Sequence, residues 1–336
     1  MKAWMIAVAA LALAACVNEQ ALNQVPAQTS VRVTPGVTYD AARGLKLDVY
    51  APAAARHAPL VLFFFGDRWQ RGTRADYRFV GQALADQGFV AMVADTGRYP
   101  PATWRKILAD GAHAVVWAQA HASDYGADGQ HPFLMGYSSG AYDAAMLALD
   151  PHWLQGAGGS RDALAGAIGI AGPYAFLPIT APDLRAIFAP PETWPQTQPL
   201  FWVDGGNPPM LLIASRADRI VDWDSTARLF DRIKRRGGPV EEVLYDALSH
   251  RALVASLAPG QQAQADVMAN VAKFIRRAVQ APWHANATVN SGIATQPSQG
   301  LVPELAAPVA LPAAGSSVAS PPSASVPAPT LPAPAP

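Results

Sequence analysis

Continuous apolar runs alternate with stretches of helical spacing through most of this chain, and this alternation limits the folds open to it. An uninterrupted apolar run of about four to eight residues fits a strand buried on both faces. Strands are expected at 45–52, 59–65, 89–95, 131–136, 164–172, 208–215 and 240–246, and helices at 74–87, 102–121, 224–236 and 261–279. Strands that alternate with helices predict an α/β fold, in which a mostly parallel central sheet carries helices on both faces.

Two stretches differ from the buried-strand pattern. Residues 45–52 (LKLDVYAP) alternate apolar and polar side chains, which predicts a half-exposed strand. Residues 174–207 are rich in proline and aromatic residues, which predicts a small irregular cap insertion over the edge of the sheet. The aromatic side chains of this cap would either line an apolar pocket or fill the cap itself, and the sequence leaves both roles open.

The first 16 residues, MKAWMIAVAALALAAC, contain a cationic residue at Lys2, a short apolar stretch and the ending LAAC. This stretch is too short to span a bilayer and has the layout of an export signal. Its ending resembles the lipobox of bacterial lipoproteins, whereas an ordinary signal peptide with an incidental cysteine is the alternative. The resemblance implies lipid attachment at Cys16 and anchoring in the bacterial cell envelope. Val17, in place of an Asp after the cysteine, favours the outer membrane, facing the periplasm or the cell surface.

The composition changes at both ends of the expected domain. Residues 17–36 predict a tether, and residues 37–280 predict one α/β domain, for which the chain is long enough. Residues 281–336 are mostly Ala, Pro, Ser and Val and hold about a dozen of the 31 prolines. Such a segment buries too little apolar surface to offset its ordering entropy, so a disordered tail is expected there.

Charge and cysteine content exclude several classes of partner and cofactor. Lys plus Arg equal Asp plus Glu at 25 each, so nothing favours nucleic acid as a partner. The single cysteine, at position 16, rules out a disulfide within one molecule. No histidines occur at a metal-ligand spacing, so neither a metal nor another cofactor is expected. The sequence gives no indication of oligomeric state.

The motif GYSSG (136–140) lies directly between an apolar strand and an Ala-rich helix. This is the strand-to-helix context of the G-x-S-x-G elbow, which presents Ser138 as a nucleophile. Helix capping by Ser138 or Ser139 is the alternative. An activated serine needs a base and an orienting acid, in the chain order Ser, acid, His for this kind of elbow.

Asp218 and His250 follow two successive expected strands and fit this order. Asp222 and Asp224 are alternatives for the acid, but they lie further into the next helix. An acyl-transfer site also needs N–H donors for the oxyanion, one of them from the residue after the nucleophile, here Ser139. The others are expected in the loop that follows the strand at 59–65.

Over about residues 40–278, the chain resembles the α/β-hydrolase esterases of the carboxylesterase and lipase group, which includes acetyl-xylan- and feruloyl-esterase-like proteins and isoprenylcysteine methylesterases. The resemblance is carried by LKLDVYAP, FFFGDRWQRGTRADY, FLMGYSSGA, GIAGPYAFLPI, PPMLLIASRADRIVDWDSTARLFDRIKRRG and VLYDALSHRAL. It implies the α/β-hydrolase fold, a triad of Ser138, Asp218 and His250, and a small-molecule ester as substrate.

The chain departs from this group in the oxyanion loop, where FGDRW (65–69) stands in place of His-Gly-Gly-Gly-Trp. Gly66 and Asp67 are the expected oxyanion donors through their backbone N–H groups. A carboxylate at Asp67 that pointed at the oxyanion would oppose its charge, so Asp67 is predicted to face away from Ser138 and to pair with Arg68 or Arg71.

These observations predict a serine carboxylesterase that forms an acyl-enzyme on Ser138. Two alternatives remain at this point. One is a catalytically impaired binding lipoprotein with the same fold, because the oxyanion loop departs from the usual sequence. The other is an amide or formamide hydrolase, because the same triad serves both reactions.

Overall fold

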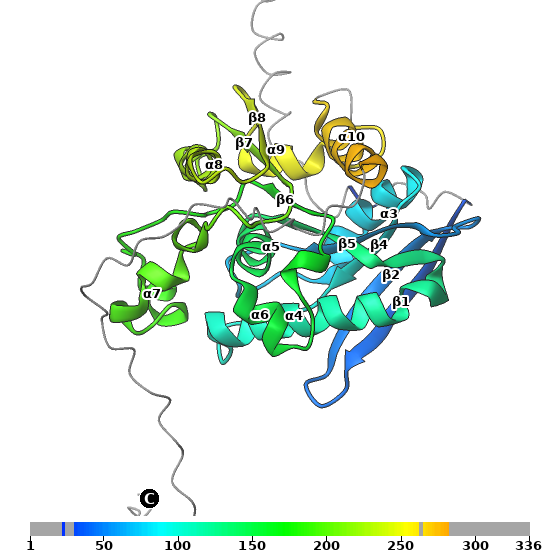
Figure 1. The fold of residues 1–336 in the computed structure, drawn as a ribbon, viewed down its shortest axis with the longest axis horizontal. Helices are drawn as coiled ribbons and strands as arrows, with labels where there is room; N and C mark the ends of the chain where they lie inside the picture. Colours follow the sequence, from blue (N-terminus) through cyan, green and yellow to red (C-terminus); the bar gives the residue numbers. More distant parts are fainter. Residues whose placement is uncertain (1–21, 24–29, 262–264, 282–336) are drawn as a thin grey trace, which may run out of the picture. The chain divides into compact units, whose positions relative to one another are not determined.

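The computed structural model describes residues 22–23, 30–261 and 265–281. Its centre is an eight-stranded sheet with the spatial order β1-β2-β4-β3-β5-β6-β7-β8 (Figure 1). The strands are β1 (Val31–Asp40), β2 (Leu45–Pro52), β3 (Ala58–Phe64), β4 (Val90–Ala94), β5 (Ala127–Tyr137), β6 (Gly166–Ile170), β7 (Met210–Ser215) and β8 (Val240–Tyr245). The strands expected from the apolar runs are all present.

Six neighbouring strands of this sheet run parallel, in the order β4-β3-β5-β6-β7-β8. The pairs β1–β2 and β2–β4 are antiparallel. The carboxyl ends of the parallel strands therefore meet at one edge, where functional groups of such sheets gather.

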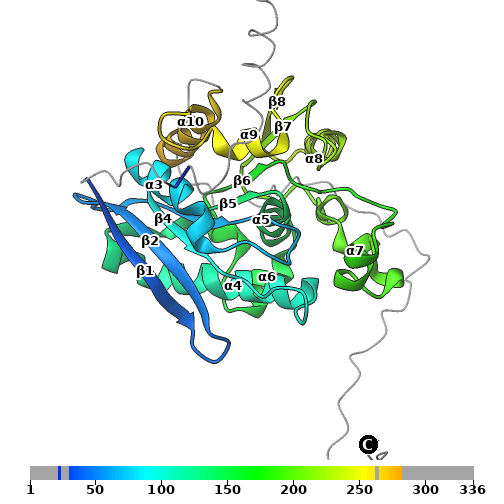
Figure 2. The same cartoon turned by 180° about the vertical axis from the view of Figure 1, so that it is seen from behind.

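Helices cover both faces of the sheet, as predicted (Figures 1 and 2). The helices of the described residues are α3 (Arg78–Asp86), α4 (Trp104–His121), α5 (Ser139–Leu149), α6 (Pro151–Gly156), α7 (Pro182–Ile187), α8 (Asp224–Arg235), α9 (His250–Ala255) and α10 (Val267–Gln280), with short 3₁₀ turns between them. Residues of α3, α9 and α10 form one apolar core with the sheet, and residues of α4, α5, α6 and α8 form another. No described helix combines the length and apolarity needed to cross a membrane.

The predicted tether at 17–36 is wrong where the structure describes it. β1 begins at Val31, and Leu22 is buried in the core against α3. Pro35-Gly36 indicates a turn in the sequence, but the register of β1 shifts between Thr34 and Val37, so that the pair forms a bulge. An edge strand tolerates a proline at such a bulge because that position donates no ladder hydrogen bond.

The predicted half-exposure of β2 is also wrong, because Leu47 to Ala51 are all buried. The polar residue that produced the alternation, Asp48, is 5% exposed and forms an ion pair with Arg74. A paired carboxylate can occupy an interior position that a polar side chain would otherwise avoid.

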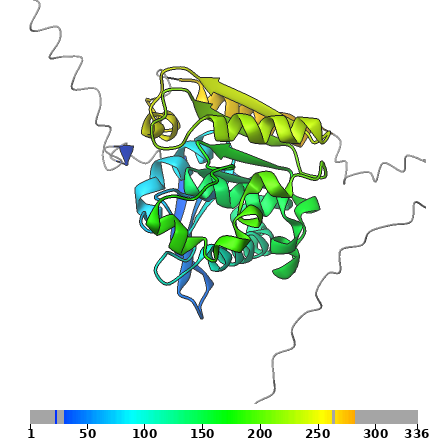
Figure 3. The same ribbon diagram turned by 90° about the vertical axis from the view of Figure 1, so that its left-hand side faces the viewer.

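Between β6 and β7 lies the predicted irregular insertion, with α7 and three 3₁₀ turns. Figures 1 and 2 show α7 on the side of the body away from β1 and β2, and Figure 3 faces that side. Helix α10 ends at Gln280, at the predicted domain boundary. The export signal and the tail after residue 281 lie outside the described residues.

Candidate active site

Ser138 lies on the sharp turn between β5 and α5. Its backbone has φ 54° and ψ −122°, a conformation that side-chain-bearing residues rarely adopt. Two glycines permit this turn: a Cβ on Gly136 would lie 2.0 Å from the carbonyl oxygen of Gly140, and a Cβ on Gly140 would lie 2.1 Å from that of Phe64. The G-x-S-x-G spacing thus lets α5 begin directly against the strands and places Ser138 at their carboxyl edge.

A continuous hydrogen-bond chain joins Ser138 to side chains from two other strand ends. His250 Nε2 lies 3.0 Å from Ser138 Oγ, and His250 Nδ1 lies 2.7 Å from Asp218 Oδ2. Asp218 follows β7, whereas His250 follows β8 and is the first residue of α9. All three residues are nearly buried. The structure therefore joins the three side chains predicted as a triad in one hydrogen-bonded chain, with His250 between Ser138 and Asp218.

Backbone N–H groups hold the carboxylate of Asp218 in place. Its Oδ1 accepts hydrogen bonds from Ile220 N at 2.8 Å and Val221 N at 3.0 Å. Burial raises the pKa of Asp218, but the hydrogen bond and charge of His250, together with the two N–H groups, outweigh burial and leave the pKa below its ordinary value. Asp218 is therefore ionised at neutral pH and can stabilise a protonated imidazole.

The two alternative acids are engaged elsewhere. Asp222 Oδ1 accepts a hydrogen bond from the backbone of Asp224, and the Asp224 carboxylate pairs with Arg228 at 2.8 Å. Of the three candidates, only Asp218 is hydrogen-bonded to His250 among the described residues.

Tyr137, the residue before Ser138, contacts both the backbone and the ring of His250. Its hydroxyl donates to the backbone carbonyl of His250 at 3.2 Å, and the two rings lie 5.0 Å apart. The sequence does not predict this contact, because it spans 113 positions of the chain and leaves no local signal.

The loop after β3 lies directly against Ser138, because a Cβ on Gly66 would be 2.9 Å from Ser138 Cβ. Within the described residues, the backbone N–H groups of Gly66, Asp67 and Ser139 donate to no acceptor. The N–H of Ser139 is free because it belongs to the first turn of α5. The three predicted oxyanion donors thus have free N–H groups, and their action on an oxyanion stays a prediction.

The Asp67 carboxylate is paired with Arg71, whose Nε lies 3.4 Å from Asp67 Oδ2. This confirms the predicted pairing with an arginine. Within the described residues, no hydrogen bond joins this carboxylate to Ser138, whose hydroxyl is bonded to His250. The negative charge of Asp67 is therefore balanced at the protein surface.

Three consecutive residues of this loop have left-handed backbones. Asp67 has φ 96°, Arg68 has φ 55° and Trp69 has φ 60°. Each such residue costs about 1–3 kcal/mol and persists only where its surroundings hold it. Asp67 and Arg68, which stand where the esterases usually have glycines, therefore strain the backbone, in addition to placing a charge near the site.

Asp183 on α7 holds this loop from the outside. Its Oδ2 accepts hydrogen bonds from Arg68 Nη2 at 2.6 Å and from Gln70 Nε2 at 2.9 Å. Hydrogen bonds therefore connect the cap insertion directly to the loop after β3, and Arg68 is one of the donors.

Trp69 connects the loop to helix α5 through its side chain and to a neighbouring loop through its backbone. Its Nε1 donates to Asp143 Oδ1 on α5 at 2.9 Å, and its backbone carbonyl accepts from Tyr99 N at 2.8 Å. Tyr99 belongs to the loop between β4 and α4, which is itself fixed by a polar network.

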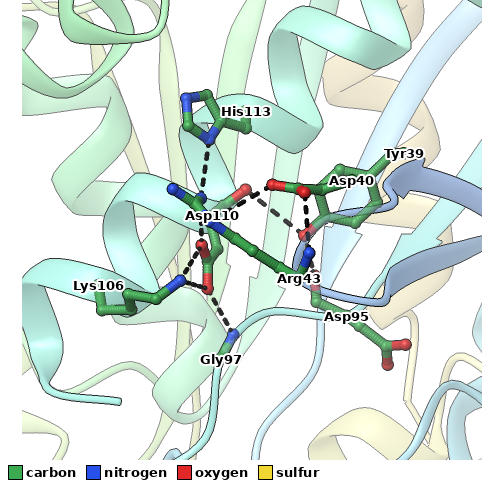
Figure 4. A network of polar contacts seen from close by, with 8 residues as sticks. All are labelled: Tyr39, Asp40, Arg43, Asp95, Gly97, Lys106, Asp110 and His113. Atoms are coloured by element: carbon green, nitrogen blue, oxygen red, sulfur yellow. Dashed lines mark hydrogen bonds and ion pairs between the residues drawn. The ribbon is translucent and has the colours of Figure 1, made fainter.

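This network is centred on the buried carboxylate of Asp110, where the side chains of Arg43 and Lys106 meet (Figure 4). Arg43 Nη1 lies 2.7 Å and Lys106 Nζ 3.0 Å from Asp110 Oδ1. Asp110 Oδ2 accepts from Gly97 N at 3.0 Å. The network thus ties the β1–β2 hairpin and α4 to the loop that contacts Trp69.

Aromatic side chains of the cap insertion pack mostly against each other and against α5. Phe188 is fully buried, with its ring centroid 5.0 Å from that of Trp69, 5.5 Å from Tyr142 and 5.3 Å from Phe176. Of the two roles left open for these aromatics, packing therefore applies to Phe188, whereas Phe201 is half exposed.

In the part of the chain that the structure describes, no group of three His, Cys, Asp or Glu side chains is arranged to hold a metal ion. The predicted lipidation site, Cys16, lies outside the described residues.

A mostly parallel sheet with a serine on the turn after β5, and with Asp and His at the ends of β7 and β8, defines an α/β hydrolase. The family model described as BD-FAE matches residues 47–160. A probable isoprenylcysteine alpha-carbonyl methylesterase of Arabidopsis thaliana is 23% identical over 228 residues, which are 61% of this chain and 48% of that protein. The fold is therefore that of the α/β hydrolases, and the chain is similar in sequence to curated esterases.

Two further similarities bear on the fold and the chemistry. Esterase B of Lactobacillus rhamnosis superposes with a TM-score of 0.67 over 83% of this chain and 97% of that chain, at 19% identity. The kynurenine formamidase of Danio rerio is 30% identical over 123 residues, 35% of this chain and 39% of that protein. The chain spans about half the length of the curated relatives it matches.

Proposed function

We propose that this protein is a serine carboxylesterase that forms an acyl-enzyme on Ser138. The observation that carries this proposal is the hydrogen-bond chain from Asp218 through His250 to Ser138, at a strand-to-helix elbow beside free backbone N–H groups. The esterase names of the relatives agree with this chemistry.

In the first half of the reaction, Ser138 Oγ attacks the ester carbonyl while His250 Nε2 takes its proton. Asp218 remains ionised, holds the Nδ1–H tautomer of His250 and stabilises the imidazolium. The N–H groups of Ser139, Gly66 and Asp67 are proposed to bind the oxyanion of the tetrahedral intermediate. His250 then returns the proton to the leaving alcohol.

In the second half, a water molecule replaces the alcohol. His250 takes a proton from this water, which attacks the acyl carbonyl, and the same N–H groups stabilise the second oxyanion. As this intermediate collapses, the bond to Ser138 Oγ breaks and His250 returns the proton to that oxygen, which releases the carboxylic acid and restores Ser138.

Replacing Ser138 by Ala tests this proposal. We expect hydrolysis of short p-nitrophenyl esters to fall at least about 10⁴-fold, because the nucleophile is lost. Ser256→Ala is the matched control: Ser256 is also buried, and its hydroxyl donates to Ala252 O, away from the triad. Activity that survives in Ser138→Ala would refute the role of Ser138.

A fluorophosphonate probe separates turnover from mere reactivity. Labelling of Ser138 without turnover on a broad panel of esters and amides would favour the alternative of a catalytically impaired binding protein. Labelling accompanied by ester turnover supports the esterase.

An amide or formamide hydrolase is the second candidate, and the similarity to a formamidase favours it. The triad serves both reactions, so only the leaving group separates them. Matched p-nitrophenyl esters and p-nitroanilides with the same acyl group, together with N-formyl anilines, decide between the two by their kcat/KM values.

We also propose that the protein is exported and anchored in the bacterial outer membrane through a lipid on Cys16. The support is the LAAC ending of an apolar N-terminal stretch, followed by Val17.

A further inference from the structure

Asp143 is a buried carboxyl group on α5, five residues after Ser138, and it is 4% exposed. Among the described residues no Lys or Arg pairs with it, and its hydrogen-bond partner is the indole N–H of Trp69. The other buried aspartates near this edge have cationic or backbone partners, as Asp110 has with Arg43 and Lys106. A buried carboxyl group with one neutral donor is costly for the fold. Because burial of this carboxyl group does not stabilise the fold, the presence of Asp143 at this position needs another explanation.

The partner of Asp143 lies at the centre of the oxyanion loop. Trp69 is the last of the three left-handed residues, and it is 9% exposed. Its ring meets those of Tyr142 and Phe188 edge to face, so that Trp69 is enclosed on two sides by apolar rings. Packing alone fixes the position of an indole less strictly than a directional hydrogen bond does.

The left-handed run starts at Asp67, directly beside Gly66, whose backbone lies against Ser138. If the loop relaxed to ordinary dihedral angles, the free N–H groups of Gly66 and Asp67 would turn with it. An oxyanion donor acts only when it is held in place before the reaction. The fixed position of Trp69 thus determines where these donors point.

We infer that Asp143 is a positioning residue for the proposed reaction: by accepting the hydrogen bond of Trp69 Nε1, it holds residues 67–69 in their left-handed conformation. This inference rests on the proposed function, because it concerns the donors that would bind the oxyanion. A carboxyl group suits this task, since it offers an acceptor oxygen in both its protonated and ionised forms. Asp143 does not itself touch the reacting atoms.

Three variants test the inference, each assayed for kcat, KM and the rate of Ser138 labelling by a fluorophosphonate. Asp143→Leu removes the acceptor at similar volume, and we expect kcat to fall about 30- to 100-fold with KM changed less than about threefold. Asp143→Asn retains an acceptor oxygen and should recover most of this loss. Trp69→Phe removes the donor and should match Asp143→Leu.

The double variant of Trp69→Phe with Asp143→Leu should lose no more activity than either single variant, because both remove one interaction. Asp150→Leu is the matched control: Asp150 is also a buried carboxyl at an end of α5, but it bonds to His152. Its kcat should equal that of the parent protein. The melting temperature of each variant shows whether it is folded.

A folded Asp143→Leu with unchanged kcat and labelling rate would overturn the inference, as would equal losses in Asp143→Leu and Asp143→Asn. If Asp143→Leu does not fold, unchanged rates in Trp69→Phe overturn the inference in the same way. If the parent protein shows no Ser138-dependent turnover, the proposed function fails, whereas the labelling rates still decide the role of Asp143.

Discussion

The side chain of Asp67 is paired with Arg71, while its backbone has φ 96°. These two properties have separate consequences. The carboxylate charge is balanced and 39% of the side chain is exposed, so its field at Ser138 is screened by water. The backbone conformation, in contrast, is one that glycine adopts without strain.

We therefore expect Asp67→Gly to leave kcat within about threefold of the parent value. The free energy of unfolding should change by about 1 kcal/mol or less, because the relief of strain is offset by the loss of the Arg71 pair and by the greater freedom of glycine in the unfolded chain. Ester kinetics and urea denaturation measure the two quantities. Asp67→Asn separates charge from conformation, and a tenfold or larger rise in kcat in both variants would show that the carboxylate opposes the oxyanion.

Asp143 gives the protein a pH dependence of stability. Burial raises the pKa of Asp143 to about 7, and the hydrogen bond from Trp69 lowers it only in part. A raised carboxyl pKa means that the folded state holds the proton more tightly, so the stability is greatest below the unfolded pKa near 4 and falls as the pH rises to about 7. The loss amounts to at most about 4 kcal/mol.

Urea denaturation of the parent and of Asp143→Asn between pH 4 and 8.5 measures this effect. The unfolding free energy of Asp143→Asn, relative to that of the parent, should increase as the pH rises to about 7 and should then level off. The neighbouring Tyr142 stays protonated throughout, because burial raises its pKa well above 10. A difference that is independent of pH would show that Asp143 does not titrate in this range.

The sequence predicted Ser138, Asp218 and His250 because each follows an apolar strand, and the strand ends of a parallel sheet converge. It did not predict the residues that support them. The Trp69–Asp143 contact spans 74 positions, and the Arg68–Asp183 contact spans 115. Such contacts depend on how loops pack over the sheet edge, which no local pattern records.

At the scale of elements, helix α7 and the loop after β3 share an ion pair. Burial alone would raise the pKa of Asp183, but hydrogen bonds from Arg68 and Gln70 outweigh it and lower the pKa. The pair is partly exposed, so its contribution to stability is about 1 kcal/mol or less. We expect the Arg68–Asp183 pair to affect the conformation of the oxyanion loop more than the stability of the fold.

We expect Asp183→Ala to lower kcat about three- to tenfold with little change in melting temperature, because the outer support of the left-handed residues is lost. Asp204→Ala is the control, since Asp204 is an exposed carboxylate that also pairs with an arginine, Arg161 at 2.8 Å, but does not contact this loop. Equal kcat values in the two variants would show that α7 has no influence on the site.

The elements that the sequence did not predict are those with weak local patterns. β1 carries Pro35-Gly36 within a bulge, and only its partner β2 shows that it is a strand. α9 has six residues and begins at His250, too short for a helical period to be recognised. The long apolar strands and helices were predicted because burial on the sheet imposes a regular pattern on many successive residues.

At the scale of the whole molecule, the first described contact of the chain with its body is at Leu22 and Asn23. Leu22 is 4% exposed, and the Asn23 side chain donates to the carbonyls of Ala75 and Asp76 and accepts from the Phe79 N–H. These contacts fix the chain beside the start of α3. Leu22 lies six positions after Cys16, and six extended residues reach at most about 22 Å.

If Cys16 carries the proposed lipid, this reach sets the distance between the anchor and the body. The side of the body that holds Leu22 would lie close to the membrane surface, in contrast to the long tether that the composition suggested. We expect the protein expressed in a bacterium to incorporate labelled fatty acid and to partition into the detergent phase of Triton X-114. Cys16→Ser should lose both properties, because the thiol is the proposed attachment point.

The kcat on a soluble ester should be the same for the parent and for Cys16→Ser, since the triad belongs to the body and needs no lipid. This equality separates the anchor from the reaction. A second comparison inserts a flexible Gly-Ser segment of about 20 residues after Val17, which lengthens the reach without changing the contacts of Leu22. If the body lies against the membrane, a protease should cut near the anchor of the lengthened protein faster than in the parent. Equal cutting rates, or a Cys16→Ser protein that stays in the detergent phase, would contradict this arrangement.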